Sequence, residues 1–353
     1  MPITRSIVAH AFGQSYARFG YNESAAYQTF IEACRRVIVT SSATITTNTG
    51  VTVGANDLPR FRNQAVDGSA ILEANAGSSG FWVNNDKTTA GPLLTTALST
   101  LSSFSPKPLF TIWSHGEQDV LSITTQTQAE NVRDAVRDVL WPQMRAGIDS
   151  VDPDDVPIWV DMIGPRFAGS EFGEYLLRDQ MIDLIDATAN TYRGAEKYAL
   201  LLDNTTHPSR DLLGYGRMGA YTGRKVAAWL VDKADEVRGP SINSGSVVKS
   251  GASVTVPITV PAGKTLIKPA SPQFFGLFDA SENRVPITGY SWSGDTLTLT
   301  AANTTATRLR YPARESGFAD INRIVRLSNP SSADRLFVGE PGLPLESAKT
   351  IVL

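Results

Sequence analysis

Only three histidines occur among the 353 residues, so each can be weighed as a general base. His10 lies inside an apolar run that predicts a β-strand, where a packed histidine is the ordinary expectation, whereas His115 and His207 each follow a predicted strand. Ser15, in the stretch AFGQSYA, stands two residues after Gly13, where the first predicted strand breaks. A serine hydroxyl becomes a nucleophile when an imidazole removes its proton. These residue types could therefore hydrolyse an ester, provided that the fold brings them together.

Strands that alternate with helices would bring these residues to one edge of a sheet. Short apolar runs bounded by Pro, Gly or Asp are typical of buried parallel strands. The predicted strands are Ser6–Phe12, Pro108–Trp113, Pro157–Ile163 and Tyr198–Leu202. Apolar residues at three- and four-residue steps predict helices between them. These helices are Thr125–Gly147, Phe172–Ala189 and Leu213–Val237. In an open α/β sheet the loops after the strands surround the ligand crevice, so loop residues far apart in the sequence can share one rim.

After residue 238 the pattern changes to strands alone. The Ser- and Gly-rich segment Gly239–Ser253 comes first, and strict alternation of apolar and polar residues follows it. The predicted strands are Val254–Val260, Asp295–Ala301, Thr307–Tyr311 and Arg323–Leu327. We therefore predict an α/β domain with a mostly parallel sheet over residues 1–238, followed by a small antiparallel β-sandwich over residues 239–353.

The composition is that of an ordinary globular protein and argues against several classes of function. Hydrophobic residues make up 42% and charged residues 19% of the chain. The formal net charge of -3 gives no electrostatic reason to expect a nucleic acid or an anionic membrane as partner. Cys34 is the only cysteine, so no intrachain disulfide and no cysteine-rich metal site can form. Since no cluster of His, Asp and Glu has metal-ligand spacing either, we expect no metal and no other cofactor.

Apolar runs are also too short for membrane targeting. No run of about 18 apolar residues is present, so we expect no membrane span. The first apolar run, Ile7–Phe12, is too short for the apolar region of a signal peptide. We therefore expect synthesis in the cytoplasm, with assembly into an extracellular viral or phage-like particle as one route out of a cell.

Four motifs follow one another in the order of a known family. They are GQS after the first predicted strand, a glycine at Gly68 in NQAVDGSAI, WSHGEQD over Trp113–Asp119, and HPSRDLLGYGRMG over His207–Gly219. Together they resemble the SGNH hydrolases, and within them the sialate O-acetylesterase and acetyl xylan esterase-like carbohydrate esterases. The resemblance covers roughly residues 7–219. It implies a flavodoxin-like three-layer sandwich with a mostly parallel sheet, and acyl transfer through a serine.

The resemblance also implies roles for individual residues. Ser15 matches the nucleophile and His207 the general base. The backbone N–H groups of Ser15 and Gly68 match donors of the oxyanion hole. His115 stands where the family has an amide donor, and a neutral imidazole can still donate one N–H. We therefore expect His115 in the oxyanion hole as well.

The carboxylate that orients the base departs from the family pattern. The family spacing D-x-x-H falls on Asn204, and the nearby acid is Asp203, four residues before His207. An amide can orient an imidazole but cannot neutralise an imidazolium, so we favour Asp203. Orientation by Asn204 or by a backbone carbonyl stays open.

Five further polar residues near the motifs are weighed as supporting or binding groups. Glu117 and Asp119 match the acids of the WSHGEQD motif, and we expect them to buttress the loop by accepting backbone N–H bonds. Gln14, Asp67 and Arg166 are candidates for contacts to substrate. A turn explains Asp67 equally well, and a surface salt bridge explains Arg166.

Two functions remain for the chain. The first is a serine esterase that removes O-acetyl groups from a carbohydrate or polysaccharide. The second is a non-catalytic or weakly active glycan-binding or structural component of a viral or phage-like particle. The departures at His115 and Asn204 and the appended β-domain motivate the second function. Its partners would include other particle proteins and further copies of this chain.

Overall fold

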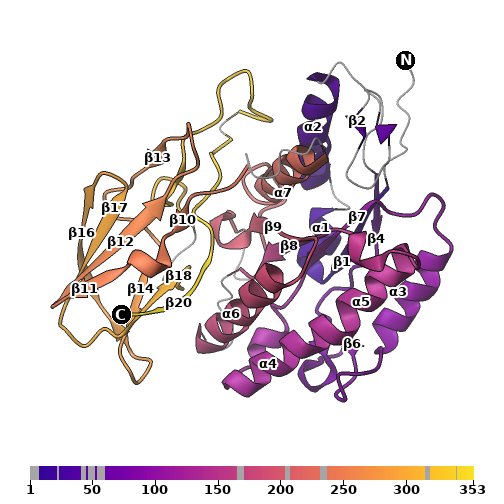
Figure 1. Cartoon of the computed structure of the whole chain (residues 1–353), viewed down its shortest axis with the longest axis horizontal. Coiled ribbons are helices and arrows are strands. Elements are labelled where there is room, and N and C mark those ends of the chain that lie inside the picture. The colour runs from indigo at the N-terminus through magenta and orange to yellow at the C-terminus, as the bar shows by residue number, and fades with distance from the viewer. Residues whose placement is uncertain are drawn as a thin grey trace.

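The computed structural model describes most of the chain, which folds into two parts of different architecture. The described residues are 8–21, 24–40, 45–46, 52–53, 60–164, 171–202, 207–230, 237–314, 319–338 and 340–353. Figure 1 shows a part with helices around a sheet, from indigo to magenta, beside a part made of strands, from orange to yellow. The chain is therefore mixed α/β, with a parallel sheet followed by antiparallel sheets.

A five-stranded parallel sheet forms the centre of the first part. Its strands are β1 (Val8–Gly13), β4 (Arg60–Asn63), β7 (Phe110–Ser114), β8 (Ile158–Met162) and β9 (Thr191–Glu196). They lie in the order β4-β1-β7-β8-β9, with Gly13 opposite Ser114 at the ends of β1 and β7. The strand order therefore reverses its direction at β1. Doubly wound sheets bind ligands outside the carboxyl ends of the strands at such a point.

Helices cover both faces of this sheet (Figure 1). One face carries α1 (Ser15–Gly20), α2 (Ser24–Thr40) and α7 (Tyr215–Leu230), and the other carries α3 (Pro92–Ser102), α4 (Gln126–Ala135), α5 (Trp141–Ile148) and α6 (Glu171–Ala187). A π-helical turn over Val136–Leu140 joins α4 to α5, so the predicted helix 125–147 is one continuous helical run. Strand β1 has buried side chains on both faces of the sheet. Ala9 and Ala11 belong to the core under α2 and α7, and Phe12 belongs to the core under α3 to α6.

One predicted strand is wrong. The fifth strand is Thr191–Glu196, and the segment 198–202 follows it as a short 3-10 turn and an isolated bridge. Tyr198 and Leu200 are buried because they pack into the core that the sheet shares with the second part, so their apolar character reflects that contact. The apolar pattern does not predict the observed strand because Arg193, Gly194 and Glu196 interrupt it.

Antiparallel sheets make up the second part. One sheet holds β10 (Ser241–Ile242), β11 (Val248–Ser250), β12 (Ser253–Thr259), β16 (Ile287–Ser293) and β17 (Thr296–Ala301). Another holds β14 (Gly276–Phe278), β15 (Arg284–Val285), β18 (Arg308–Tyr311) and β20 (Ala348–Val352). A smaller antiparallel pair in this part is β13 (Leu266–Ile267) with β19 (Arg326–Leu327). Two further pairs belong to the first part of the chain: β2 (Ile45–Thr46) with β3 (Thr52–Val53) is antiparallel, and β5 (Ala70–Leu72) with β6 (Phe81–Val83) is parallel. In β12 the apolar residues Val254, Val256 and Ile258 are buried, as the alternation predicted.

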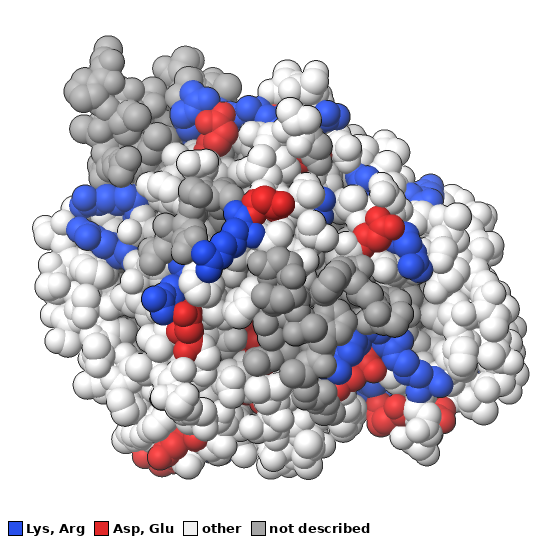
Figure 2. Space-filling view, turned by 180° about the vertical axis from the view of Figure 1, so that it is seen from behind, with Lys and Arg blue, Asp and Glu red and all other residues white. Residues whose placement is uncertain are grey.

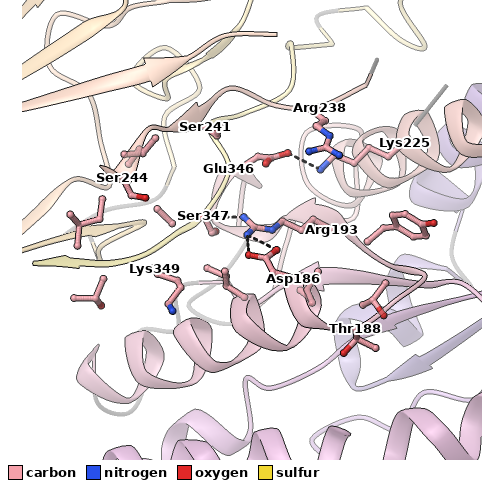
Figure 3. Close-up of a pocket in the computed structure, with 18 of the residues that line it drawn as sticks. Asp186, Thr188, Arg193, Lys225, Arg238, Ser241, Ser244, Glu346, Ser347 and Lys349 are labelled. Carbon is pink, nitrogen blue, oxygen red and sulfur yellow. Dashed lines mark hydrogen bonds and ion pairs between the residues drawn. The ribbon is translucent and has the colours of Figure 1, made fainter. Parts of the chain in front are cut away.

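The two parts pack against each other through one continuous apolar core. The Tyr311 hydroxyl donates to the Tyr198 hydroxyl at 2.8 Å, and the Tyr198 hydroxyl donates to the Leu345 carbonyl. A groove of about 850 Å³ opens between the parts, and Figure 3 shows its charged side chains. Arg193 reaches from β9 to Asp186 and to the backbone carbonyl of Ser347. These contacts fix the second part on the edge of the parallel sheet.

Charges on one face of the molecule are mixed in sign. On the face in Figure 2, blue Lys and Arg side chains often lie beside red Asp and Glu side chains, and no extended patch of one sign covers the described residues. This distribution agrees with the small net charge of -3. No helix within the described ranges is both long and apolar enough to cross a bilayer.

Candidate active site

Ser15 and His207 line the same cavity, which has a volume of about 260 Å³. Its walls come from four separate segments: the start of α1, the turn after β4, the loop after β7 and the segment before α7. The lining residues are Gln14, Ser15, Tyr16, Phe19, Asp67, Gly68, Glu117, Gln118 and His207. Six of the residues expected at the site from the sequence therefore meet here: Gln14, Ser15, Asp67, Gly68, Glu117 and His207.

The turn that carries Ser15 is fixed by close packing of β1 on β7. Gly13 has a φ of +126°, and a Cβ at this position would lie 2.1 Å from the carbonyl oxygen of Ser114. The backbone N–H of Gln14 donates to that same oxygen at 3.0 Å. Helix α1 then begins at Ser15, which is 8% exposed. Only glycine allows this approach, so Gly13 places the serine at the cavity wall.

His207 lies against the helix that Ser15 begins. The imidazole ring is 6.1 Å from the Tyr16 ring and meets the Phe19 ring edge-on at 5.9 Å, measured between centroids. Asp203 and Asn204 lie outside the described residues. Which of the two orients His207 therefore stays a prediction.

The turn that carries Gly68 presents a backbone N–H near the serine. Gly68 has a φ of +65°, in the left-handed region that favours glycine. The turn is tied to the serine loop because the N–H of Val66 donates to the Gly13 carbonyl at 3.0 Å. Within the described part of the chain, the backbone N–H groups of Ser15 and Gly68 donate to no protein acceptor. Both donors thus remain for an oxygen of a ligand.

His115 lies behind the cavity wall and is not among its lining residues. The side chain is fully buried, and its ring is stacked on Trp113 at a centroid distance of 6.0 Å. The N–H of Gly116 donates to Nδ1 at 2.8 Å, so the imidazole proton sits on Nε2, which lies 3.3 Å from Ser69 Oγ. Burial lowers the pKa of His115 to about 3, and the nearby Lys197 charge adds to this effect. The ring is therefore neutral, and it reaches the Gly68 turn through Ser69.

The two acids of the WSHGEQD motif lie in different surroundings. Asp119 is fully buried and accepts hydrogen bonds from Ile71 N–H at 2.9 Å, Leu72 N–H at 3.3 Å and Asn75 Nδ2 at 2.9 Å. These hydrogen bonds hold Asp119 against β5, as expected for a residue that supports the loop. Burial raises the pKa of Asp119 to about 6. Glu117 lines the cavity instead.

Lys197 is a site residue that the sequence did not indicate. Its ammonium is fully buried and pairs with the Glu117 carboxylate. It also donates to Ser114 Oγ at 3.2 Å and lies 4.7 Å from the centroid of the Tyr16 ring. Lys197 follows β9, some 80 residues from the motif, and only the fold brings it below the cavity.

Charged side chains also lie beside the cavity at Asp67, Arg18 and Arg210. Asp67 pairs with Arg18 at 2.8 Å, with side chains that are 37% and 52% exposed. The guanidinium of Arg210 lies 5.3 Å from the Phe19 ring centroid. Arg166 falls outside the described residues, so its expected contact to substrate stays a prediction. Among the residues that the structure describes, no group of three or more His, Cys, Asp and Glu could hold a metal ion.

Comparisons with known proteins identify the fold. No protein-family model and no curated protein matches this chain. A carbohydrate acetylesterase from Xanthomonas citri has a similar structure, with a TM-score of 0.57 and 15% identity over 96% of this chain and 79% of that one. A carbohydrate acetylesterase from Sinorhizobium meliloti has a TM-score of 0.39 and 13% identity, over 63% of this chain and 97% of that one. The likeness to the Xanthomonas citri structure extends over nearly the whole chain and shows a shared fold.

Proposed function

We propose that this protein is a serine esterase of the SGNH type that removes O-acetyl groups from a carbohydrate. The observation that carries the proposal is the cavity of about 260 Å³ that Ser15, Gly68 and His207 line together, although they lie far apart in the sequence. Its volume is slightly below that of pockets for drug-sized ligands, which suits a small acyl group. The carbohydrate part of the proposal is supported by the fold shared with the Xanthomonas citri enzyme.

The reaction would proceed through an acetyl-serine. His207 takes the proton of Ser15 Oγ as this oxygen attacks the ester carbonyl carbon. The backbone N–H groups of Ser15 and Gly68 then donate to the negatively charged carbonyl oxygen. When the tetrahedral intermediate collapses, His207 gives its proton to the sugar oxygen and the alcohol leaves. Water, losing a proton to His207, next attacks the acetyl carbon, acetate departs and the proton returns to Ser15 Oγ.

The direct test is release of acetate. The purified chain is expected to hydrolyse p-nitrophenyl acetate and to release acetate from acetylated polysaccharides. Ser15→Ala and His207→Ala should each lower kcat by at least about 10³-fold, since a nucleophile and its base act as a unit. Ser99→Ala, on the exposed face of α3, is the matched control and should leave the rate unchanged. Wild-type rates in Ser15→Ala would exclude the proposal. Polysaccharide binding without acetate release would favour glycan recognition instead.

A further inference from the structure

A saturated hydrogen-bond network lies directly behind the Gly68 turn. At its centre is Ser69 Oγ, which accepts from Trp82 Nε1 at 3.0 Å and donates to the Val66 carbonyl at 2.8 Å. The Nε2 of His115 lies 3.3 Å from the same oxygen. Ser69, Trp82 and His115 are all buried to at least 99%. Water therefore does not compete for these hydrogen bonds. In such a buried environment each hydrogen bond is strong and holds its donor and acceptor in place.

The direction of each hydrogen bond follows from the number of hydrogens. Since Gly116 N–H donates to Nδ1 of His115, Nε2 carries the only ring proton and must donate to Ser69 Oγ. A serine hydroxyl has one proton and two lone pairs. The proton goes to the Val66 carbonyl at 2.8 Å, with the Gly13 carbonyl as a more distant second acceptor at 3.4 Å, and the lone pairs accept from Trp82 and His115. Every donor and acceptor of the hydroxyl is thus used.

The His115 ring is itself held in a single orientation. It stacks on Trp113 with an interplanar angle of 14° and meets Trp82 edge-on at 88°. Both tryptophans are buried, and the Gly116 N–H fixes the ring rotation. The imidazole can therefore act as a rigid support for the Ser69 hydroxyl.

The network holds both ends of the turn that presents Gly68. At one end, Val66 is bound through its N–H to the Gly13 carbonyl and through its carbonyl to the Ser69 hydroxyl. At the other end, Ser69 is bound to Trp82 and His115. Gly68 lies between these anchors with its N–H available to a ligand. Gly13 precedes Ser15 by two residues, so the same contacts set the Gly68 N–H relative to the Ser15 N–H.

We propose that Ser69 and His115 are positioning residues of the oxyanion hole, and that His115 acts on the oxyanion only through Ser69 and the Gly68 turn. This inference rests on the esterase function proposed above. It replaces direct donation from His115 with an indirect role. The negative charge on the carbonyl oxygen develops only during the reaction. A displaced Gly68 N–H therefore reduces the stabilisation of the transition state more than it reduces binding of the ester.

The experiment compares an ester with its thiono analogue. Sulfur is a weaker hydrogen-bond acceptor than oxygen, so an enzyme with a well-placed oxyanion hole prefers p-nitrophenyl acetate over p-nitrophenyl thionoacetate. We expect Ser69→Ala and His115→Leu each to lower kcat on the oxygen ester by about tenfold, with little change in KM, and to reduce the oxygen-over-sulfur preference by a similar factor. His115→Gln should recover much of the preference, because the amide N–H2 can donate to Ser69 Oγ and the amide oxygen can accept from the Gly116 N–H.

A double variant and a distant control separate positioning from general stability. Ser69→Ala combined with His115→Leu should reduce the preference no further than either single change, because both changes break one network. His10→Gln removes another buried imidazole, bound to Thr111 and Gln64, and should leave the preference unchanged. An active wild type whose Ser69 and His115 variants keep the full preference would overturn this inference alone. A wild type that hydrolyses neither ester would overturn the esterase proposal and this inference with it.

Discussion

The ammonium of Lys197 and the carboxylate of Glu117 form a fully buried ion pair directly below the candidate active site. Both charged groups lost their hydration when they were buried, and the attraction between them offsets part of that free-energy cost. Lys197, in the turn after β9, also donates to Ser114 Oγ at the end of β7 at 3.2 Å. Glu117 accepts from the N–H of Gly164, which follows β8, at 3.4 Å, so the pair links the segments at the ends of β7, β8 and β9. The floor of the cavity is therefore held by charge as well as by apolar packing.

Removing one member of this pair should destabilise the fold strongly. Lys197→Met removes the positive charge that faces the buried Glu117 carboxylate, and we expect the free energy of unfolding to fall by about 3–5 kcal/mol. Lys349→Met is the control, since Lys349 pairs with Asp183 at the surface and both side chains are about half exposed. That change should cost less than about 1 kcal/mol. Adding Glu117→Gln to Lys197→Met should recover part of the loss. Equal unfolding midpoints for the two lysine variants in urea would contradict the prediction.

The group that orients His207 can be identified by two substitutions. If Asp203 holds the imidazole, Asp203→Asn should reduce kcat by on the order of 10²–10⁴-fold, because an amide cannot stabilise the imidazolium and can favour the wrong tautomer. Asn204→Ala should then change kcat by less than about threefold, a loss too small for an orienting group. Steady-state rates on p-nitrophenyl acetate decide between them. The reverse ranking would assign the role to Asn204, and two small effects would point to a backbone carbonyl.

The sequence predicted those parts of the site that local pattern controls. The strands before Ser15 and His115 are buried on both faces, so they appear as short apolar runs that end at Gly13 and Ser114. Edge strand β9 carries polar residues instead, and the apolar pattern predicts a strand in the segment that follows it.

Contacts between distant segments could not be predicted in the same way. Lys197, Ser69 and Trp82 have no local motif, and their roles come only from contacts with residues that are distant in the sequence. The sequence also gives no means of telling which nitrogen of His115 carries the proton, since the N–H of Gly116 decides this.

Gly13 should tolerate no side chain. In Gly13→Ala the new Cβ would overlap the Ser114 carbonyl, and the residue would keep a φ near +126° that L-residues rarely adopt. We expect a loss of stability on the order of 3 kcal/mol, together with loss of esterase activity as the Ser15 turn shifts. Gly245→Ala is the matched control, because nothing lies within 4 Å of a Cβ there. Thermal unfolding and acetate release measure the two effects. An active Gly13→Ala protein with the wild-type Tm would show that the turn can relax.

His10 should make the fold sensitive to acid. The ring is fully buried, with Nδ1 2.7 Å from Thr111 Oγ1 and Nε2 2.8 Å from Gln64 Oε1. Burial lowers the pKa of His10 to about 4, against 6.5 in the unfolded chain, although the hydrogen bond to Gln64 partly opposes this shift. Above pH 6.5 both states are neutral at this position, so the group has no effect on stability. Between pH 6.5 and 4 the unfolded state binds a proton that the folded state does not, so stability falls as the pH falls.

The size of this effect can be measured with a variant that does not titrate. The shift predicts a loss of about 3 kcal/mol from His10 between pH 7 and pH 4. His115, whose pKa is lowered to about 3, adds a loss of the same sign. In His10→Gln we expect the difference between the unfolding free energies at pH 7 and pH 4 to shrink by about 3 kcal/mol, whatever the change costs at pH 7. Urea unfolding at both pH values gives this difference directly. If His10→Gln kept the wild-type difference, the imidazole of His10 would not be the group that titrates.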